Sequence, residues 1–407
     1  MNLFSCVVND PLKWRTCVRW IQRMGEGLLI ACAALLIAAC GGGVGTGGTG
    51  TYAAGPISGF GSIIVGGVRY DETQAAITDD LGRTRSIAEL KLGAMVEVEA
   101  GSVLVDASGA ALAKAQRVRL TSDIVGPVTA LDLVAGRLTV LGQDVRVAAD
   151  TVFDARLPAG LASLLSGTVV EVYARYDASS NAYMATRLEV ASDPTAWKIR
   201  GTVTSVDPAS GTLRIGNTAV VAPGGVAAGL TTGQTVRLQL QSSNVPGAAV
   251  QAIAASGAER KPGEGSEVRL SGLVTSWMSA ALFSVDGVLV DASTSTFPNG
   301  QAGLKLGARV EVRGTALSAQ VRAAEVRVEA EDAAVTREFD FKGPIEAVDA
   351  RTKTFVLRGT TISYDRTGLR LEGGTESDLT VGRSVEVKAV PSAKDRSRVE
   401  AIRIVFK

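Results

Sequence analysis

The chain has 407 residues, of which 46% are hydrophobic, 5% aromatic and 20% charged, so it can bury hydrophobic cores and is not a disordered polyelectrolyte. Its 42 Lys and Arg residues balance 41 Asp and Glu residues, which argues against the basic surface of a nucleic-acid-binding protein. It has no histidine, and all four cysteines lie within residues 1–40. Catalysis by Ser-His-Asp or Cys-His groups, a disulfide framework and a His/Cys zinc site are therefore excluded from the rest of the chain. We expect no cofactor and no nucleic-acid partner.

Residues 1–39 have the layout of a signal peptide. The apolar stretch from Leu28 to Ala39 has twelve residues, too short for a membrane-spanning helix, which takes about 20. It follows four basic residues, Lys13, Arg15, Arg19 and Arg23. The alternative is a short buried helix that happens to end in cysteine. The true start, at Met1 or at Met24, stays open.

The apolar stretch ends in Leu36-Ile37-Ala38-Ala39-Cys40. This segment resembles the lipobox of bacterial lipoproteins. The resemblance implies cleavage before Cys40 and a lipid on the Cys40 thiol, which would attach the protein to a membrane. Gly41 follows where inner-membrane lipoproteins have aspartate, so we expect an outer-membrane lipoprotein of the cell envelope, on its periplasmic or its surface face.

Residues 40–53 are predicted to be a Gly-rich tether. A phosphate-binding loop is rejected there because no strand precedes the glycines and no helix follows them.

Five similar units follow the tether. Each opens with a glycine before a β-forming pair, at Gly55, Gly126, Gly201, Gly272 and Gly343, with steps of 71, 75, 71 and 71 residues. Each contains a second glycine before a Val-rich strand, at Gly93, Gly167, Gly233, Gly307 and Gly382. We assign repeat 1 to residues 54–122, repeat 2 to 123–194, repeat 3 to 195–258, repeat 4 to 267–331 and repeat 5 to 338–407.

The hydrophobic pattern inside a unit alternates with a period of two, which predicts strands. A two-residue turn joins the second and third strands, at Gly66-Gly67, Gly142-Gln143, Gly216-Asn217, Asp286-Gly287 and Arg358-Gly359. A short helix or turn is expected between the third and fourth strands. Five strands in this layout predict an all-β fold of five tandem OB-like barrels. A unit of about 70 residues has a marginal core, so neighbouring units should pack together.

These landmarks resemble a family of bacterial lipoprotein repeats known only as a domain of unknown function with an OB-like barrel. The resemblance covers residues 54–407 and implies a fold, not an activity.

Three groups of carboxylates are the candidates for chemistry: Asp71-Glu72, Asp79-Asp80, and Glu329 with Glu331 and Asp332. None has the spacing of a calcium loop, and we interpret them as solvated turns and linkers. Four glutamates recur on the fourth strand, Glu97, Glu171, Glu311 and Glu386, and are interpreted as its outward face. The aromatic residues Tyr70, Tyr364, Trp197 and Trp277 are expected to pack in cores or linkers.

The sequence therefore favours a non-enzymatic, lipid-anchored array of barrels that binds an envelope glycan or protein, although no residue identifies the ligand. The alternative is a carboxylate-dependent enzyme that hydrolyses an envelope polysaccharide, which requires two acidic residues about 5–10 Å apart in a cleft between barrels. A spacer without a ligand fits the sequence equally well.

Overall fold

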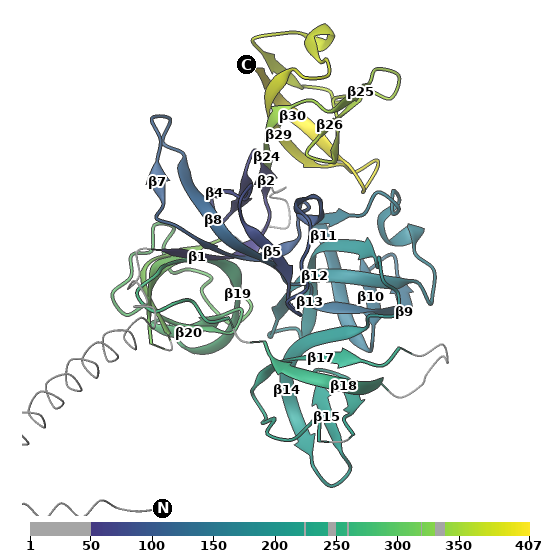
Figure 1. Cartoon of the computed structure of the whole chain (residues 1–407), viewed down its shortest axis with the longest axis vertical. Helices are drawn as coiled ribbons and strands as arrows, with labels where there is room; N and C mark the ends of the chain where they lie inside the picture. The colour runs from purple at the N-terminus through teal and green to yellow at the C-terminus, as the bar shows by residue number, and fades with distance from the viewer. Residues whose placement is uncertain (1–49, 224, 243–249, 259, 319, 330–337) are drawn as a thin grey trace, which may run out of the picture. The chain divides into compact units, whose positions relative to one another are not determined.

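The computed structural model describes residues 50–223, 225–242, 250–258, 260–318, 320–329 and 338–407. These residues form strands joined by turns (Figure 1). Their helical structure consists of three single-turn 3₁₀ segments, η1 (Ile87–Glu89), η2 (Gly160–Ser163) and η3 (Glu376–Asp378). In the described part of the chain, no helix has the length and apolarity needed to cross a membrane.

The strands fall into five successive sets, which we call barrels 1 to 5. Barrel 1 contains β1 (Thr51–Pro56), β2 (Gly59–Phe60), β3 (Ile63–Val65), β4 (Val68–Asp71), β5 (Ala76–Asp79), β6 (Met95–Ala100), β7 (Leu104–Val105) and β8 (Ala111–Leu120). Barrel 2 contains β9 (Ile124–Asp132), β10 (Arg137–Val140), β11 (Gln143–Phe153), β12 (Val169–Asp177) and β13 (Ala182–Val190). Barrel 3 contains β14 (Lys198–Asp207), β15 (Thr212–Ile215), β16 (Thr218–Val221), β17 (Thr235–Leu240) and β18 (Val250–Gly257).

Barrels 4 and 5 complete the chain. Barrel 4 contains β19 (Glu267–Ser279), β20 (Leu282–Val285), β21 (Val288–Asp291), β22 (Arg309–Leu317) and β23 (Gln320–Val328). Barrel 5 contains β24 (Phe339–Pro344), β25 (Ala347–Asp349), β26 (Thr354–Leu357), β27 (Thr360–Ser363), β28 (Arg370–Glu372), β29 (Ser384–Pro391) and β30 (Val399–Phe406).

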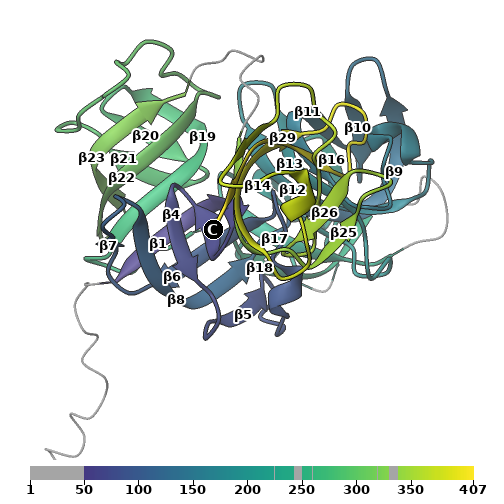
Figure 2. The same ribbon diagram turned by 90° about the horizontal axis from the view of Figure 1, so that it is seen from above.

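Each set closes in the strand order of an OB barrel. In barrel 2, β9 pairs with β10, β10 with β11, β11 with β13 in parallel, β13 with β12, and β12 returns to β9. The same circuit closes barrel 3 and, separately, barrel 4, whose strands β19 to β23 lie together in Figure 2. In barrels 1 and 5 some strands are broken into shorter pieces, but the order is unchanged. The predicted all-β, OB-like fold is confirmed.

The second repeated glycine has a conformation that explains its recurrence. It precedes the fourth strand of each barrel, with φ between +78° and +90°. Its N–H donates to a carbonyl of the first strand or its immediate continuation at 2.8 Å in all five barrels, from Gly93, Gly167, Gly233, Gly307 and Gly382. A side chain is strained in this left-handed region, so glycine is the residue that allows this bond at least cost.

In barrels 2 and 3 the first repeated glycine recurs for a different reason, because it allows close packing. A Cβ atom on Gly126 would lie 2.4 Å from Leu141 Cγ, and one on Gly201 would lie 2.4 Å from Ile215 Cγ2. Leu141 and Ile215 lie at the end of the second strand of their barrels. The missing Cβ of the glycine therefore lets the first strand come close to this neighbouring strand.

The hairpin turns lie at the predicted positions in four barrels. In barrel 2 the predicted Gly142-Gln143 turn is wrong by one residue. The turn is Leu141-Gly142, with both φ angles positive, and Gln143 begins β11. The side chain of Gln143 is buried and donates to the Ile215 carbonyl at 2.7 Å, and this tertiary contact favours its place in the strand.

The first strands also join barrels to one another. β1 pairs in parallel with β19, β2 in parallel with β24, and β9 antiparallel with β14. The hydrophobic clusters also join barrels: one combines barrels 1 and 5 with Val152 and Tyr173 of barrel 2, a second combines barrels 2 and 3, and a third combines barrel 4 with β1. The prediction that neighbouring units pack together is confirmed. β1 begins at Thr51, inside the segment assigned to the tether (40–53), because residues 51–54 pair with both β6 and β19.

Candidate functional site

A cavity of about 850 Å³ lies where barrels 2, 3 and 4 meet. All its lining residues belong to the same compact unit, residues 48–407. β12 and β13 contribute one wall, β14 and the start of β17 a second, and β19 to β23 a third, while residues 260–262 cross from barrel 3 to barrel 4 beside it. A cavity of this size fits a small ligand or a few units of a polymer.

Asp123 and Arg200 form an ion pair at the boundary of barrels 2 and 3. Arg200 Nη1 lies 3.2 Å from Asp123 Oδ1, and the Ala174 N–H donates to Oδ2 at 3.0 Å. Arg200 Nη2 also donates to the Ala258 carbonyl at 3.1 Å. Burial raises the pKa of Asp123, and Arg200 and Arg260 oppose that rise only in part. Both carboxylate oxygens of Asp123 are therefore occupied by protein donors.

Arg260 lies between three barrels on the connecting segment. Its guanidinium is almost fully buried, with Nη1 2.9 Å from Asp286 Oδ2 and Nε 3.5 Å from Glu97 Oε1. Burial by itself would lower the pKa of Arg260, but Asp286 and Glu97 outweigh it and raise the pKa. Arg260 thus stays cationic and connects barrel 1 with barrel 4.

Cations outnumber acids among the described residues of the lining. The cations are Arg175, Arg200, Arg260 and Lys261, and the acids are Asp123 and Asp286. Arg175 comes from β12 and donates from Nη2 to Ser271 Oγ at 3.1 Å.

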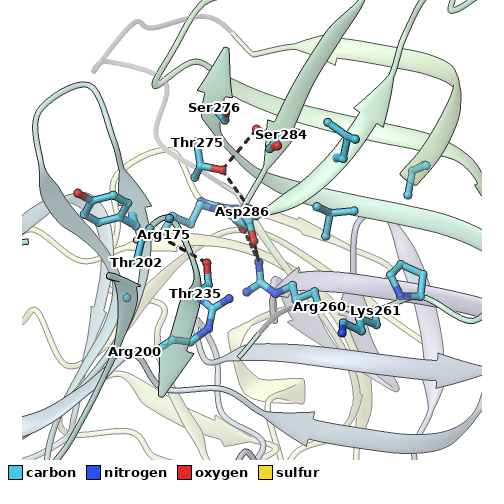
Figure 3. Close-up of a pocket in the computed structure, with 18 of the residues that line it drawn as sticks. Arg175, Arg200, Thr202, Thr235, Arg260, Lys261, Thr275, Ser276, Ser284 and Asp286 are labelled. Atoms are coloured by element: carbon cyan, nitrogen blue, oxygen red, sulfur yellow. Dashed lines mark hydrogen bonds and ion pairs between the residues drawn. The ribbon is translucent and has the colours of Figure 1, made fainter. Parts of the chain in front are cut away.

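Hydroxyl groups form much of the remaining surface. Figure 3 shows Thr275, Ser276 and Ser284 along one side of the cavity and Arg200, Arg260 and Lys261 along the other. Thr202, Thr235, Ser318, Tyr176 and Tyr183 add five further hydroxyl-bearing side chains to the lining. This combination offers hydrogen-bond donors and acceptors in a recess but supplies no histidine or thiol nucleophile.

The predicted lipid-attachment residue, Cys40, lies outside the described residues, as does the whole predicted signal peptide. Glu331 and Asp332 also lie outside them, while Glu329 Oε2 lies 3.7 Å from Arg309 Nε.

The interpretation of the other carboxylates as solvated turns is wrong at three positions. The side chain of Asp80 has no exposed surface and contacts Lys198 and Arg237 of barrel 3. Glu72 is buried against Arg358 of barrel 5 and accepts from the Ile63 N–H at 3.1 Å. Asp79 is buried and accepts from two backbone N–H groups and Arg83. The cause is tertiary, since the partners of Asp80 and Glu72 come from other barrels.

The repeated glutamates of the fourth strand differ from one another. Glu97 is buried beside Arg119 and Arg260, which corrects its interpretation as an outward residue. Glu171, Glu311 and Glu386 are half-buried. Glu386 pairs with Lys342 and Lys407, both at 3.0 Å. None of the four lines the cavity.

The four aromatic residues named from the sequence do not line the cavity, and three of them pack in cores or linkers as predicted, whereas Trp277 is exposed on β19. Tyr70 and Tyr364 are buried, and Tyr364 stacks on Phe355. Trp277 stacks on Phe283 with 38% of its surface exposed, and Trp197 Nε1 donates to the Pro194 carbonyl at 2.9 Å.

Sequence reasoning did not single out the lining cations, because they share no position in the repeat. The sequence predicts Asp286 only as a residue of the hairpin turn Asp286-Gly287. Its φ is +46°, and Gly287 follows with φ +87°, so the hairpin turn itself brings this carboxylate to the cavity. Within the described residues, no group of three or more His, Cys, Asp or Glu side chains could hold a metal ion.

Comparison with protein families gives three matches to DUF5666, a domain of unknown function, over residues 125–189, 271–327 and 342–404. The chain contains three copies of this domain. The matched DUF5666 segments lie in barrels 2, 4 and 5, whereas barrels 1 and 3 have the same strand order without a match.

No curated protein matches the chain. A solved structure of drosophila Unr CSD456 is similar at 15% sequence identity, over 53% of this chain and 99% of that chain, with a TM-score of 0.14. At that score the likeness supports no argument, so the OB assignment depends on the strand order.

Proposed function

We propose that this DUF5666 protein is a non-catalytic lipoprotein of the bacterial envelope that binds an envelope glycan in the cavity between barrels 2, 3 and 4. The observation that carries the proposal is the cavity itself, because three barrels combine charged and hydroxyl side chains in one recess. Saccharides offer many hydroxyl groups, which match such a surface better than they match an apolar pocket.

The membrane attachment is supported by the sequence of residues 28–41. Replacement of Cys40 by serine (Cys40→Ser) should abolish incorporation of labelled fatty acid and move the protein from the membrane to the soluble or unprocessed fraction. The measurement is palmitate labelling with cell fractionation. Labelling that persists in this variant would contradict attachment at Cys40.

Binding is favoured over hydrolysis by the bonding of the two cavity carboxylates. Asp123 accepts from Arg200 and the Ala174 N–H, and Asp286 accepts from Arg260 and the Leu273 N–H. A glycosidase needs one carboxyl group that gives its proton to the leaving group and a second that faces the sugar. Here the carboxylates hold arginines in place instead.

A cavity-filling variant tests the binding site. Ser276 is exposed on β19 and lines the cavity, so Ser276→Trp should block the recess while the barrel still folds. Purified protein would be titrated with peptidoglycan, lipopolysaccharide and capsule-type glycans. We expect saturable binding to one class and at least about a tenfold loss in Ser276→Trp, the loss that about 1.4 kcal/mol produces.

Ala130→Trp is the matched control, since Ala130 is an exposed residue of β9 outside the cavity. Equal loss in both variants, or no saturable binding to any glycan, would contradict the proposed function.

A polysaccharide hydrolase is the second candidate, and one observation favours it. Asp123 is a carboxyl group of raised pKa in a recess between barrels, which is typical of a general acid. Release of reducing ends from a bound glycan, lost in Asp123→Asn while binding persists, would establish the enzyme and overturn the non-catalytic proposal.

A further inference from the structure

We propose that the hairpin formed by β7 and the start of β8 contacts the lipid surface of the membrane that holds the anchor on Cys40. This inference rests on the proposed lipid attachment and does not involve the cavity. Leu104 and Val105 of β7 are each 70% exposed. Figure 1 shows β7 and the start of β8 as a two-stranded hairpin that extends beyond the rest of barrel 1. Adjacent exposed apolar side chains on such a hairpin are typical of a surface that a partner covers.

The strand register divides the side chains of the hairpin between two faces. Val105 pairs with Ala111, and Ala111 packs against the hydrophobic cluster of barrels 1 and 5. Leu104 pairs with Leu112 in the same ladder. Because side chains alternate along a strand and paired residues share a face, the two leucines lie on the face directed away from the core. Leu112 is half-buried, so Leu104 and Leu112 form an apolar pair on the outside of the barrel.

The chain enters barrel 1 beside this hairpin, and this fact identifies the partner as a membrane. Thr51 pairs with Ala100. Leu104 follows Ala100 by four residues, so it lies within about 14 Å of that point. Cys40 precedes Gly50 by ten residues, which can span about 36 Å at most. A lipid on Cys40 therefore keeps the hairpin within reach of the membrane.

The short connection also makes a weak contact sufficient. A group tethered by a short segment meets its partner at a high effective concentration, so the second contact needs little affinity of its own. Two leucines would not hold a free protein on a lipid surface, but they can orient one that a lipid already attaches.

Trp277 and Met278 form a second exposed apolar pair, and their position argues against the same role. β1 pairs in parallel with the first residues of β19, Thr51 with Glu267. Trp277 follows Glu267 by ten residues, roughly 25–33 Å along a curved strand. The hairpin is therefore closer to the point where the chain enters.

Two features limit the hairpin to the headgroup layer. The Ser108 hydroxyl and the Ala110 N–H donate to the Asp106 carboxylate in the turn and lower its pKa, so it stays charged. Among the described strands, β7 pairs with β8 alone, so its other edge keeps open backbone groups. Neither a charge nor an open strand edge is tolerated in hydrocarbon. The hairpin thus lies along the surface, with its leucines at the boundary between headgroups and acyl chains.

The test uses the full-length, lipidated chain with one fluorescent probe. Residues 41–407 contain no cysteine, so Leu104→Cys supplies a single reactive thiol once Cys40 is acylated. An NBD probe is coupled to this thiol, and the protein is incorporated into vesicles of phosphatidylethanolamine and phosphatidylglycerol. We expect a blue shift of the emission and a severalfold loss of quenching by aqueous iodide, with unchanged circular dichroism.

Val134→Cys is the matched control. Val134 is an apolar, fully exposed residue in the turn between β9 and β10, and β9 pairs with β10, β12 and β14 rather than with strands of barrel 1. Its probe should keep its emission and its quenching. Lys114 pairs with Asp71 on the outward face, so the charges there balance, and the response at Leu104 should persist in vesicles of phosphatidylcholine alone.

The outcomes separate the hairpin contact from the lipid attachment. A response at Leu104 and none at Val134 supports the contact. Equal responses at both positions overturn the contact, as does no response at Leu104 in protein that incorporates palmitate and floats with the vesicles, and both results leave the attachment standing. A response that is lost in phosphatidylcholine shows charge attraction and overturns the apolar contact. Protein that neither incorporates palmitate nor floats overturns the attachment and the inference together.

Discussion

Asp80 illustrates how a tertiary contact determines the role of a single side chain. Its two oxygens lie 2.8 Å from Lys198 Nζ and 2.7 Å from Arg237 Nε, and all three side chains are buried. One carboxylate from barrel 1 thereby forms ion pairs with two cations of barrel 3. The local sequence, Asp79-Asp80 before a Gly-containing turn, predicts a solvated turn, since the partners lie 118 and 157 positions away.

Replacement of this carboxylate should strongly destabilise the protein. Asp80→Asn leaves Lys198 and Arg237 buried without a compensating charge, which costs about 3–5 kcal/mol when one partner of a buried pair is removed. The measurement is the free energy of unfolding in urea. Asp365→Asn is the control, because the side chain of Asp365 is 61% exposed and should change stability little. A similar, small loss in both variants would contradict the structural role of Asp80.

At the scale of the element, the repeated glycines could be predicted from the sequence, but their physical causes could not. Gly167 has φ +87° and open space around the position of a Cβ, so its role is conformational. Gly126 has no positive φ, but a Cβ atom at this position would lie 2.4 Å from Leu141 Cγ, so its role is steric. The sequence alone predicts only that both glycines lie in a turn or a strand, and it does not distinguish their roles.

Gly167→Ala should therefore reduce stability through backbone strain alone. The expected cost is about 1–2 kcal/mol, the cost of a side chain in the left-handed region. Gly101→Ala provides the comparison, since Gly101 also has open space but no positive φ. Urea unfolding of both variants measures the difference. If the two alanine variants proved equally stable, the backbone argument for the five glycines would fail.

At the scale of the whole molecule, ion pairs between side chains from different parts of the sequence connect the barrels, and one of these pairs is fully buried. Glu97 of barrel 1 contacts Arg260, Lys91 of barrel 1 contacts Glu189 of barrel 2, and Arg309 of barrel 4 contacts Asp150 of barrel 2. These ion pairs add to the strand pairings between barrels. We therefore expect the free energy of unfolding to depend on the protonation of the acidic residues in these pairs.

Stability should accordingly fall in acid, and Glu97 should account for part of the fall. Burial by itself would raise the pKa of Glu97, but Arg260 and Arg119 outweigh it and lower the pKa from its ordinary value of 4.5. A lowered pKa in the folded state gives stability that is complete above pH 4.5 and is lost as the pH falls through the folded-state pKa.

Thermal unfolding between pH 7 and pH 3 measures this effect. Glu97→Gln should have a lower midpoint at pH 7 and a shallower decline in acid than the unaltered protein. A parallel decline in both proteins would show that Glu97 does not contribute to the pH dependence.

The sequence by itself determined the repeat, the OB strand order and the hairpin turns of four barrels. These features depend on the alternation of apolar and polar residues and on the positions of glycines within a unit of about 70 residues. It also predicts Cys40 as the lipid-attachment residue, because the motif around this cysteine is recognised in the sequence without a folded structure. Only the tertiary structure decided which barrels share strands and where the cavity lies. Arg175, Arg200, Arg260 and Asp286 come together from different barrels and a connecting segment, and a contact between distant segments leaves no local pattern in a single sequence.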